Sequence, residues 1–213
     1  DKKTPIGVYN LLHKKRSLDE FYGPLALTTS YPNSFDKSLN KTGHGIWIHG
    51  MPLKGDREKF TQGCIALDNE PLQKLETKID LKNSLLITSQ DYINKPTKDE
   101  LVSLMSMVYK WRYSWKYSNL EDYLNFYGDD FKWYNKMNKK EFAYYKKAVF
   151  LKKEQKVIKF TNIQATIYPN SLNKRLFRVY MDEYYKSDNV KFVGTKELIV
   201  EFKNGVFKIL FED

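Results

Sequence analysis

Apolar and polar residues alternate in short runs through the first part of the chain, which is typical of half-buried strands. Glycine, proline and asparagine bound the runs, as expected where strands turn. The pattern predicts five strands, at residues 4–12, 26–32, 44–50, 63–67 and 84–89. Leu72, Leu75 and Ile79 recur instead at helical spacing, and Pro71 suits a first helical turn. We therefore expect a small, mainly β domain with one helix at 68–79.

The apolar spacing becomes helical soon after residue 94. Thr97 and Glu100 form a capping-box pattern ahead of an apolar stripe that runs toward Trp115. Two further helices are predicted at 119–128, which a glycine ends, and at 138–155.

Strand-like alternation takes over from Val157 to the end of the chain. The pair Asn204-Gly205 separates two alternating runs, and this dipeptide strongly favours a tight hairpin turn. Helices followed by a curved antiparallel sheet make an α+β domain. We place a domain boundary at about residue 94, which gives domains 1–94 and 95–213.

Composition supports this division. Of the 33 Phe, Tyr and Trp residues, 25 follow residue 94. The formal net charge is +10, of which +2 belongs to residues 1–94 and +8 to residues 95–213. Hydrophobic residues make up 41% of the chain, enough for a packed core, and no apolar run approaches the roughly 18 residues that a membrane helix needs.

Cys64 is the only cysteine, so no intramolecular disulfide is expected. Such a cysteine is either a small buried hydrophobe or a reactive thiol. The three histidines and Cys64 lack any paired ligand spacing, so neither a metal site nor a cofactor is predicted.

His49 ends the predicted strand 44–50 and lies fifteen residues before Cys64. Alternation puts Trp47 and His49 on one face of that strand and His44 on the other. If the strands of His49 and Cys64 are neighbours, the two side chains can meet across a groove. An imidazole can lower the pKa of a thiol and hold the thiolate, which is a workable acyl-transfer nucleophile. On these residues alone, a buried structural cysteine remains the alternative.

The string "HGIWIHG", followed after ten residues by "TQGCIALDN", resembles the signature of the L,D-transpeptidase (YkuD-type) family. The segments "KKTPIGVYNL" and "YPNSFDK" resemble two other segments of that family, so the similarity covers residues 1 to about 90. It implies a β-sandwich catalytic domain with a helix, here lacking its N-terminal strands.

The resemblance also assigns roles by position. Cys64 is the implied nucleophile and His49 the general base, with the Gly50 carbonyl orienting the imidazole. Thr61 takes the hydroxyl position of the motif, and the backbone N–H groups of Gly63 and Cys64 are candidates for stabilising an oxyanion.

The chain departs from the family pattern at two positions next to the cysteine. Gln62 replaces a histidine, and Ala66 replaces an arginine that would offer a bidentate carboxylate partner. We therefore expect Arg57 or Lys54, on the loop 51–60, to meet a substrate carboxylate; a solvated charged loop is the alternative. Further substrate-binding candidates are Trp47, Gln62 and His44.

The longer string "GHGIWIHGMPLKGDR" with a Tyr- and Lys-rich extension resembles the L,D-carboxypeptidases that set helical cell shape in Helicobacter- and Campylobacter-type bacteria. There the extension has a nuclear-transport-factor-like α+β fold. This implies a periplasmic enzyme that trims tetrapeptide stems of peptidoglycan to tripeptides by releasing D-Ala, with other cell-shape proteins as partners. A transpeptidase forming 3-3 crosslinks and a catalytically silent wall-binding scaffold are the alternatives.

The basic second domain admits its own alternatives. Interleaved aromatic and basic residues can bind single-stranded nucleic acid, but the lysines are dispersed and no ribonucleoprotein-type motif is present, so no nucleic-acid partner is expected. A solvated basic surface around an aromatic core is the simplest interpretation. In a wall enzyme it can hold anionic glycan or peptide carboxylates. We expect this domain to bind substrate or a partner and to hold no catalytic residue.

Overall fold

The computed structural model describes residues 2–55 and 61–213. The chain divides into two compact units, Asp1–Asp91 and Tyr92–Asp213. Among the described helices, none has the length and apolar character needed to cross a membrane.

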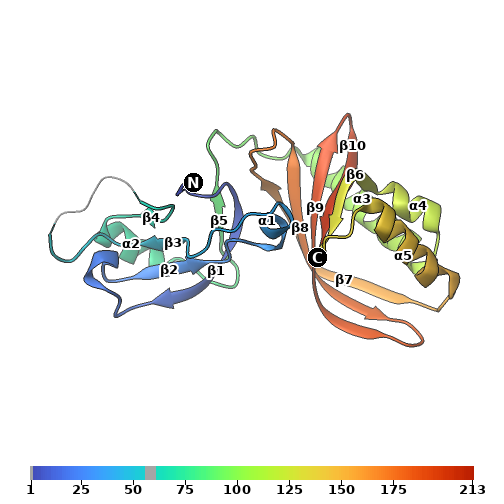
Figure 1. The fold of residues 1–213 in the computed structure, drawn as a ribbon, viewed down its shortest axis with the longest axis horizontal. Coiled ribbons are helices and arrows are strands. Elements are labelled where there is room, and N and C mark those ends of the chain that lie inside the picture. Colours follow the sequence, from blue (N-terminus) through green and yellow to red (C-terminus); the bar gives the residue numbers. More distant parts are fainter. Residues whose placement is uncertain (1, 56–60) are drawn as a thin grey trace. The chain divides into compact units, whose positions relative to one another are not determined.

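The first unit is built on a five-stranded sheet in the order β4-β3-β2-β1-β5 (Figure 1). Strand β1 joins two halves of this sheet, because Gly7–Asn10 pair with β5 and the end of β1 pairs with β2. The pairings are antiparallel except for β3 with β4, which is parallel. The five predicted strands are thus all present, at Gly7–Lys15 (β1), Ala26–Thr29 (β2), Trp47–His49 (β3), Ile65–Ala66 (β4) and Leu85–Thr88 (β5).

The predicted helix of the first unit is confirmed as α2, Asn69–Glu76. Its Leu72 is fully buried, in a core with Leu11, Leu25, Leu27 and Ile48. Two short elements were not predicted: the 3-10 helix η1 (Glu20–Tyr22) and α1 (Ser34–Ser38). Both are too short to show a helical repeat in sequence.

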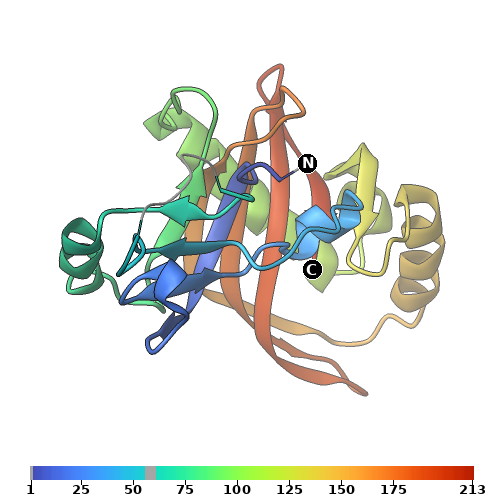
Figure 2. The same cartoon turned by 60° about the vertical axis from the view of Figure 1, so that its left-hand side comes forward.

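The second unit has a five-stranded sheet in the order β6-β10-β9-β8-β7, with three helices over one face (Figure 1). The strands β7, β8 and β9 are long and bend along their length (Figure 2). The elements are α3 (Lys98–Lys116), α4 (Leu120–Asn125), β6 (Tyr127–Trp133), α5 (Lys139–Leu151), β7 (Val157–Tyr168), β8 (Leu176–Lys186), β9 (Lys191–Lys203) and β10 (Val206–Glu212).

The two strongest local sequence signals in this unit, a capping box and a hairpin turn, are confirmed. The Thr97 N–H donates to Glu100 Oε2 at 2.8 Å, and the Glu100 N–H donates to Thr97 Oγ1 at 3.1 Å, which completes the capping box. Asn204 and Gly205 have φ values of 52° and 77°, as a type I′ hairpin turn between β9 and β10 requires.

The prediction was wrong about the segment around Gly128. The helix ends at Asn125, and Gly128 lies inside β6, which pairs parallel with β10, so the sheet is mixed rather than wholly antiparallel. Tyr127 and Phe131 are both buried, and their spacing of four fits a strand as well as a helix. A Cβ on Gly128 would lie 2.8 Å from Leu210 Cδ2, so glycine allows the two strands to approach.

Charged side chains lie within the aromatic core of the second unit. The Lys196 ammonium is 3.0 Å from Glu212 Oε1 and 3.7 Å from Glu183 Oε2. The Tyr127 hydroxyl donates to Glu212 Oε2 at 2.7 Å. The Lys146 ammonium lies over several aromatic rings, and burial lowers its pKa to about 8. These four charged residues are referred to below as the core charge cluster.

Candidate active site in the first unit

His49 is held at the end of β3 in the middle of three paired strands. It lies opposite Ala26 of β2 and Ala66 of β4, and it is 1% exposed. Its Nδ1 is 2.8 Å from the Gly50 carbonyl oxygen. A carbonyl only accepts, so Nδ1 carries the proton and Nε2 is the basic nitrogen of the neutral ring.

The turn after His49 depends on glycine. The Gly50 N–H donates to the carbonyls of Tyr22 (3.0 Å) and Leu25 (3.2 Å). Asn69 Oδ1 accepts from the Met51 N–H at 2.9 Å, and a Cβ on Gly50 would lie 2.3 Å from that oxygen. A larger residue at position 50 would therefore push Asn69 Oδ1 away from the Met51 N–H and disturb the turn that carries the Gly50 carbonyl.

An aromatic ring packs against the histidine. The Tyr22 ring meets the His49 ring edge-on, with centroids 5.2 Å apart, and lies 5.3 Å from the Trp47 ring. The Lys15 ammonium lies 4.8 Å from the centroid of the Trp47 ring. These contacts restrict rotation of the imidazole, so its orientation is fixed from two sides.

Cys64 comes directly before β4 and is partly exposed as a free thiol. Because Ile65 pairs with Ile48, the register continued by one residue sets Cys64 opposite Trp47. Side chains alternate along strands, so Cys64, Trp47 and His49 belong to the same side of the sheet. The Cys64 thiol contacts the Gly45 carbonyl oxygen at 3.5 Å.

The residues before the cysteine form a tight turn. Thr61 Oγ1 donates to the Cys64 carbonyl at 2.6 Å and accepts from the Gly63 N–H at 3.2 Å. Gly63 has a φ of 105°, and a Cβ there would lie 2.8 Å from Ile46 Cδ1. Since the Gly63 N–H is engaged by Thr61, an oxyanion must displace that contact or use the Cys64 N–H instead.

The other predicted substrate-binding residues have fewer described contacts than His49 and Cys64. Gln62 and His44 are exposed, and His44 precedes β3 rather than lying within it, because Gly45 has a φ of 70° that breaks the strand alternation. Lys54 is exposed and pairs with Glu20 at 3.1 Å. Arg57 lies outside the described residues. Within the described ranges, no group of three or more His, Cys, Asp or Glu residues could hold a metal ion.

Two residues near His49 were missed from sequence. Tyr22 comes from η1, far from the motif, and nothing in its surroundings in the sequence signals a contact with His49. Asn69 was visible only as a residue near a helix start, yet its side chain fixes the backbone after the histidine.

Two family profiles match the chain, one in each unit. The profile of the L,D-transpeptidase catalytic domain (YkuD) matches residues 1–87. The profile of the Cds6 C-terminal NTF2-like domain matches residues 103–213. No curated protein sequence matches the chain.

Solved structures match both units together. Two crystal structures of the helical cell shape determining protein Pgp2 from Campylobacter jejuni are similar to all of this chain. The K307A mutant has 39% identity, a TM-score of 0.94 and 75% of its chain covered; the other has 40%, 0.91 and 76%. Bd1075 of Bdellovibrio bacteriovorus has 29% identity and a TM-score of 0.78, with 100% of this chain and 80% of that chain covered.

These matches confirm the predicted order of folds, a mainly β L,D-transpeptidase-like domain followed by a nuclear-transport-factor-like α+β domain. The chain belongs to the L,D-transpeptidase (YkuD) family, in the two-domain form with an NTF2-like domain that Pgp2 of C. jejuni also has.

Proposed function

We propose that this protein is a cysteine-dependent L,D-carboxypeptidase of peptidoglycan, which releases the terminal D-Ala of tetrapeptide stems and leaves tripeptides. The observation that carries the proposal is the fixed tautomer of His49. Its Nδ1–H donates to the Gly50 carbonyl. The register of β3 with β4, continued by one residue, puts its ring on the same side of the sheet as Cys64. Membership of a family with an L,D-transpeptidase catalytic domain supplies the substrate class.

The first half of the reaction forms a thioester. His49 Nε2 accepts the Cys64 thiol proton, and the sulfur attacks the carbonyl at the L-centre of meso-diaminopimelate in the stem. The C–N bond to D-Ala then breaks, and Nε2 returns the proton to the leaving amine. The backbone N–H of Cys64 is the nearest candidate to stabilise the oxyanion formed in between.

The second half regenerates the enzyme. Water gives a proton to His49 Nε2 while its oxygen attacks the thioester carbonyl, and the C–S bond breaks as Sγ recovers that proton. A stem-peptide amine in place of water would give a 3-3 crosslink. The name of the family domain, L,D-transpeptidase, favours this crosslinking reaction as a second candidate function. The measurement that distinguishes the two identifies the acceptor as water or as an amine.

The decisive measurement is mass analysis of the products from purified tetrapeptide muropeptides, with and without an added stem-peptide amine. We expect tripeptide and free D-Ala in both cases. A 3-3 crosslinked dimer would instead assign a transpeptidase. The absence of any product from a folded protein would leave a wall-binding scaffold.

Single substitutions assign the catalytic roles. Cys64→Ala and His49→Ala are expected to abolish D-Ala release, because each removes a group that no other residue supplies. The matched control is His13→Ala, since His13 is exposed on β1 and has no place in the mechanism. Full activity in Cys64→Ala would refute cysteine catalysis.

The name of Pgp2 describes a cell-shape protein, and by analogy we propose that this enzyme acts on the wall in the periplasm and influences cell shape. The second unit is proposed to bind substrate or a cell-shape partner and to take no direct part in the chemistry. Arg57 and Lys54 remain proposed carboxylate-binding residues, although Lys54 is already paired with Glu20.

A further inference from the structure

The two peptide groups that follow His49 are held by different partners. Neighbouring segments bind the first group on both sides. The His49 carbonyl accepts from the Leu67 N–H at 2.9 Å, and the Gly50 N–H donates to the Leu25 carbonyl at 3.2 Å. The second group joins Gly50 to Met51, and its carbonyl is the one that His49 Nδ1 contacts at 2.8 Å. The orientation of this second group therefore decides what faces Nδ1.

The side chain of Asn69 holds the second peptide group from its far side. Asn69 Oδ1 accepts from the Met51 N–H at 2.9 Å. A backbone N–H only donates, so the atom that faces it is the amide oxygen. A trans peptide group is planar, with its N–H and its C=O pointing in opposite directions. The bond from Met51 to Asn69 therefore directs the Gly50 carbonyl away from Asn69 and toward His49 Nδ1.

Glycine at position 50 makes the orientation depend on this bond, because glycine has no Cβ to restrict rotation of the peptide plane. Turning the plane over would point the Met51 N–H at Nδ1 in place of the carbonyl. Nδ1 would then have to accept, and the proton of the neutral ring would move to Nε2. An Nε2 that carries a proton cannot take another from the Cys64 thiol. The direction of one peptide group thus selects the tautomer that the proposed reaction needs.

Two glycines make room for the amide of Asn69. A Cβ on Gly50 would lie 2.3 Å from Asn69 Oδ1, and a Cβ on Gly23, which follows η1, would lie 2.8 Å from it. Asn69 is half-buried. It is the first residue of α2, after the N-cap Asp68, and its Oδ1 bonds the turn after His49. The side chain is therefore enclosed between two turns that belong to other segments.

The segment that carries Asn69 also carries the nucleophile. Asn69 follows Cys64 by five residues. Between them, β4 pairs with β3, where Ala66 lies opposite His49, and Leu67 binds the His49 carbonyl. One short segment thus places the thiol and also holds the backbone on both sides of the base. The position of the nucleophile and the orientation of the base are fixed by the same piece of chain.

We propose that Asn69 is a positioning residue for His49. Acting through the Gly50–Met51 peptide group, it keeps the ring proton on Nδ1 and so keeps Nε2 able to accept the Cys64 proton. Hydrogen bonds in a chain polarise one another, so the bond to Asn69 also strengthens the Gly50 carbonyl as an acceptor. The inference rests on the proposed function for the use of this tautomer, whereas the tautomer itself is a property of the folded protein.

Two substitutions of nearly the same shape test the role of the oxygen. Asn69→Leu removes the acceptor for the Met51 N–H, and Asn69→Asp keeps an oxygen in its place. For Asn69→Leu we expect kcat for D-Ala release to fall about tenfold to a hundredfold, because the base is misoriented. KM should stay within about threefold, because no group that binds substrate has been removed. Asn69→Asp should keep kcat within about threefold of the wild-type value.

Nitrogen-15 NMR of the imidazole reads the tautomer directly, without substrate. The spectra are recorded in the Cys64→Ala background at alkaline pH, where the ring is neutral. His13 and His44 are both exposed, and a His49→Ala spectrum identifies the signals of His49. We expect a protonated Nδ1 and an unprotonated Nε2 in the parent protein and in Asn69→Asp. Asn69→Leu should instead show a mixture of tautomers.

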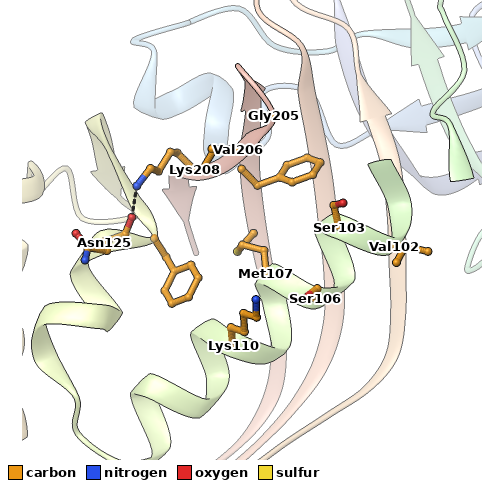
Figure 3. Close-up of a pocket in the computed structure, with 11 residues that line it drawn as sticks. Val102, Ser103, Ser106, Met107, Lys110, Asn125, Gly205, Val206 and Lys208 are labelled. Carbon is orange, nitrogen blue, oxygen red and sulfur yellow. Dashed lines mark hydrogen bonds between the residues drawn. The ribbon is translucent and has the colours of Figure 1, made fainter. Parts of the chain in front are cut away.

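Two control variants each lose a side-chain bond to the backbone elsewhere. Asn33 caps α1 by accepting from the Asp36 N–H at 2.8 Å, beyond the end of β2 that is farther from His49. Asn33→Ala should lower the melting temperature and leave the tautomer and kcat unchanged. In the second unit, Lys208 of β10 donates to the Asn125 carbonyl, beside the pocket of about 550 Å³ that Figure 3 shows. Lys208→Met should also leave both quantities unchanged.

Three results would overturn the proposal. The first is a folded Asn69→Leu protein with the wild-type tautomer. The second is an Asn69→Asp protein as impaired as Asn69→Leu, which would show that the oxygen is not what matters. The third is an equal change of tautomer in Asn33→Ala, which would indicate a general effect of lost stability. If the wild-type protein releases no D-Ala, the proposed function alone fails, because the NMR measurement needs no catalysis.

Discussion

Replacing Lys196 with Met is expected to destabilise the second unit by about 3 to 5 kcal/mol, because it breaks a buried ion pair and leaves a carboxylate without its partner. The Lys196 side chain is 11% exposed and that of Glu212 is 2% exposed. Burial opposes both charges, yet attraction to Glu212 and Glu183 raises the pKa of Lys196. Lys196 and Lys146 likewise hold the pKa of Glu212 below its ordinary value despite burial.

The magnitude follows from the geometry of the core charge cluster. At an effective dielectric constant of about 20, unit charges 3.0 Å apart attract by about 5 kcal/mol. Methionine keeps most of the volume of lysine, so the loss is electrostatic rather than a cavity effect. Two carboxylates then share Lys146, and burial has already lowered the pKa of Lys146 to about 8.

The assay is urea denaturation at pH 7, followed by tryptophan fluorescence. Three of the four tryptophans, Trp111, Trp115 and Trp133, belong to the second unit and report its unfolding. The matched control is Lys139→Met, whose partner Asp129 is at 2.9 Å but has a side chain that is 98% exposed. Exposed pairs contribute little, so we expect a loss below about 1 kcal/mol.

A second substitution tests the electrostatic cause. Adding Glu212→Gln to Lys196→Met removes the uncompensated charge and keeps an acceptor for the Tyr127 hydroxyl, so part of the stability should return. A loss in Lys196→Met no greater than in Lys139→Met would refute the reasoning. The reasoning would also be refuted if adding Glu212→Gln lowered the free energy of unfolding further, by as much as an independent second substitution would.

Two further predictions concern the catalytic turn and the response to acid. Gly50→Ala should lower the proposed D-Ala release about a hundredfold and cost about 1 to 3 kcal/mol, because its Cβ would lie 2.3 Å from Asn69 Oδ1. Gly55→Ala is the control for activity: its Cβ would meet nothing within 4 Å, although its φ of 76° costs alanine about 1 kcal/mol of stability. Equal activity loss in both variants would contradict this. Hydrogen bonds from Arg175 hold the pKa of Glu100 at about 2. The contribution of ionised Glu100 to the free energy of unfolding is therefore fully present above a pH of about 4.5 and is lost as the pH falls toward 2. Acid denaturation should show this loss in the wild-type protein and much less of it in Glu100→Gln. An identical acid profile in the two proteins would show that the pair does not stabilise the fold.

Sequence predicted most elements of the fold because its local signals agreed with the tertiary environment. The Thr97 capping box and the Asn204-Gly205 turn are each decided within a few residues, and both are confirmed. The segment around Gly128 was misassigned because its pairing with β10 depends on residues about eighty positions away. Local periodicity carries no information about such a partner.

The candidate site was predicted from sequence only in part. The motif pointed to His49 and Cys64, and the contact between His49 Nδ1 and the Gly50 carbonyl has the expected geometry, while the catalytic roles remain proposals. Tyr22 and Asn69 were missed because their contacts with this turn are made through space. Alternation also failed at His44, because a positive φ at Gly45 precedes the strand.

The spacing of fifteen residues between His49 and Cys64 has a topological cause. Strands β3 and β4 are parallel neighbours, and a parallel pair needs a crossover connection of about a dozen residues or more. An antiparallel pair could be joined by two residues, but Cys64 would then enter the sheet from the opposite end. The length of the connection is therefore what a parallel neighbour requires, while the register of the two strands decides which side chains share a side of the sheet. The length does not by itself imply a substrate contact. Its one described cation, Lys54, pairs with Glu20, so a role in binding carboxylate requires that this exposed ion pair open, at a cost of less than about 1 kcal/mol.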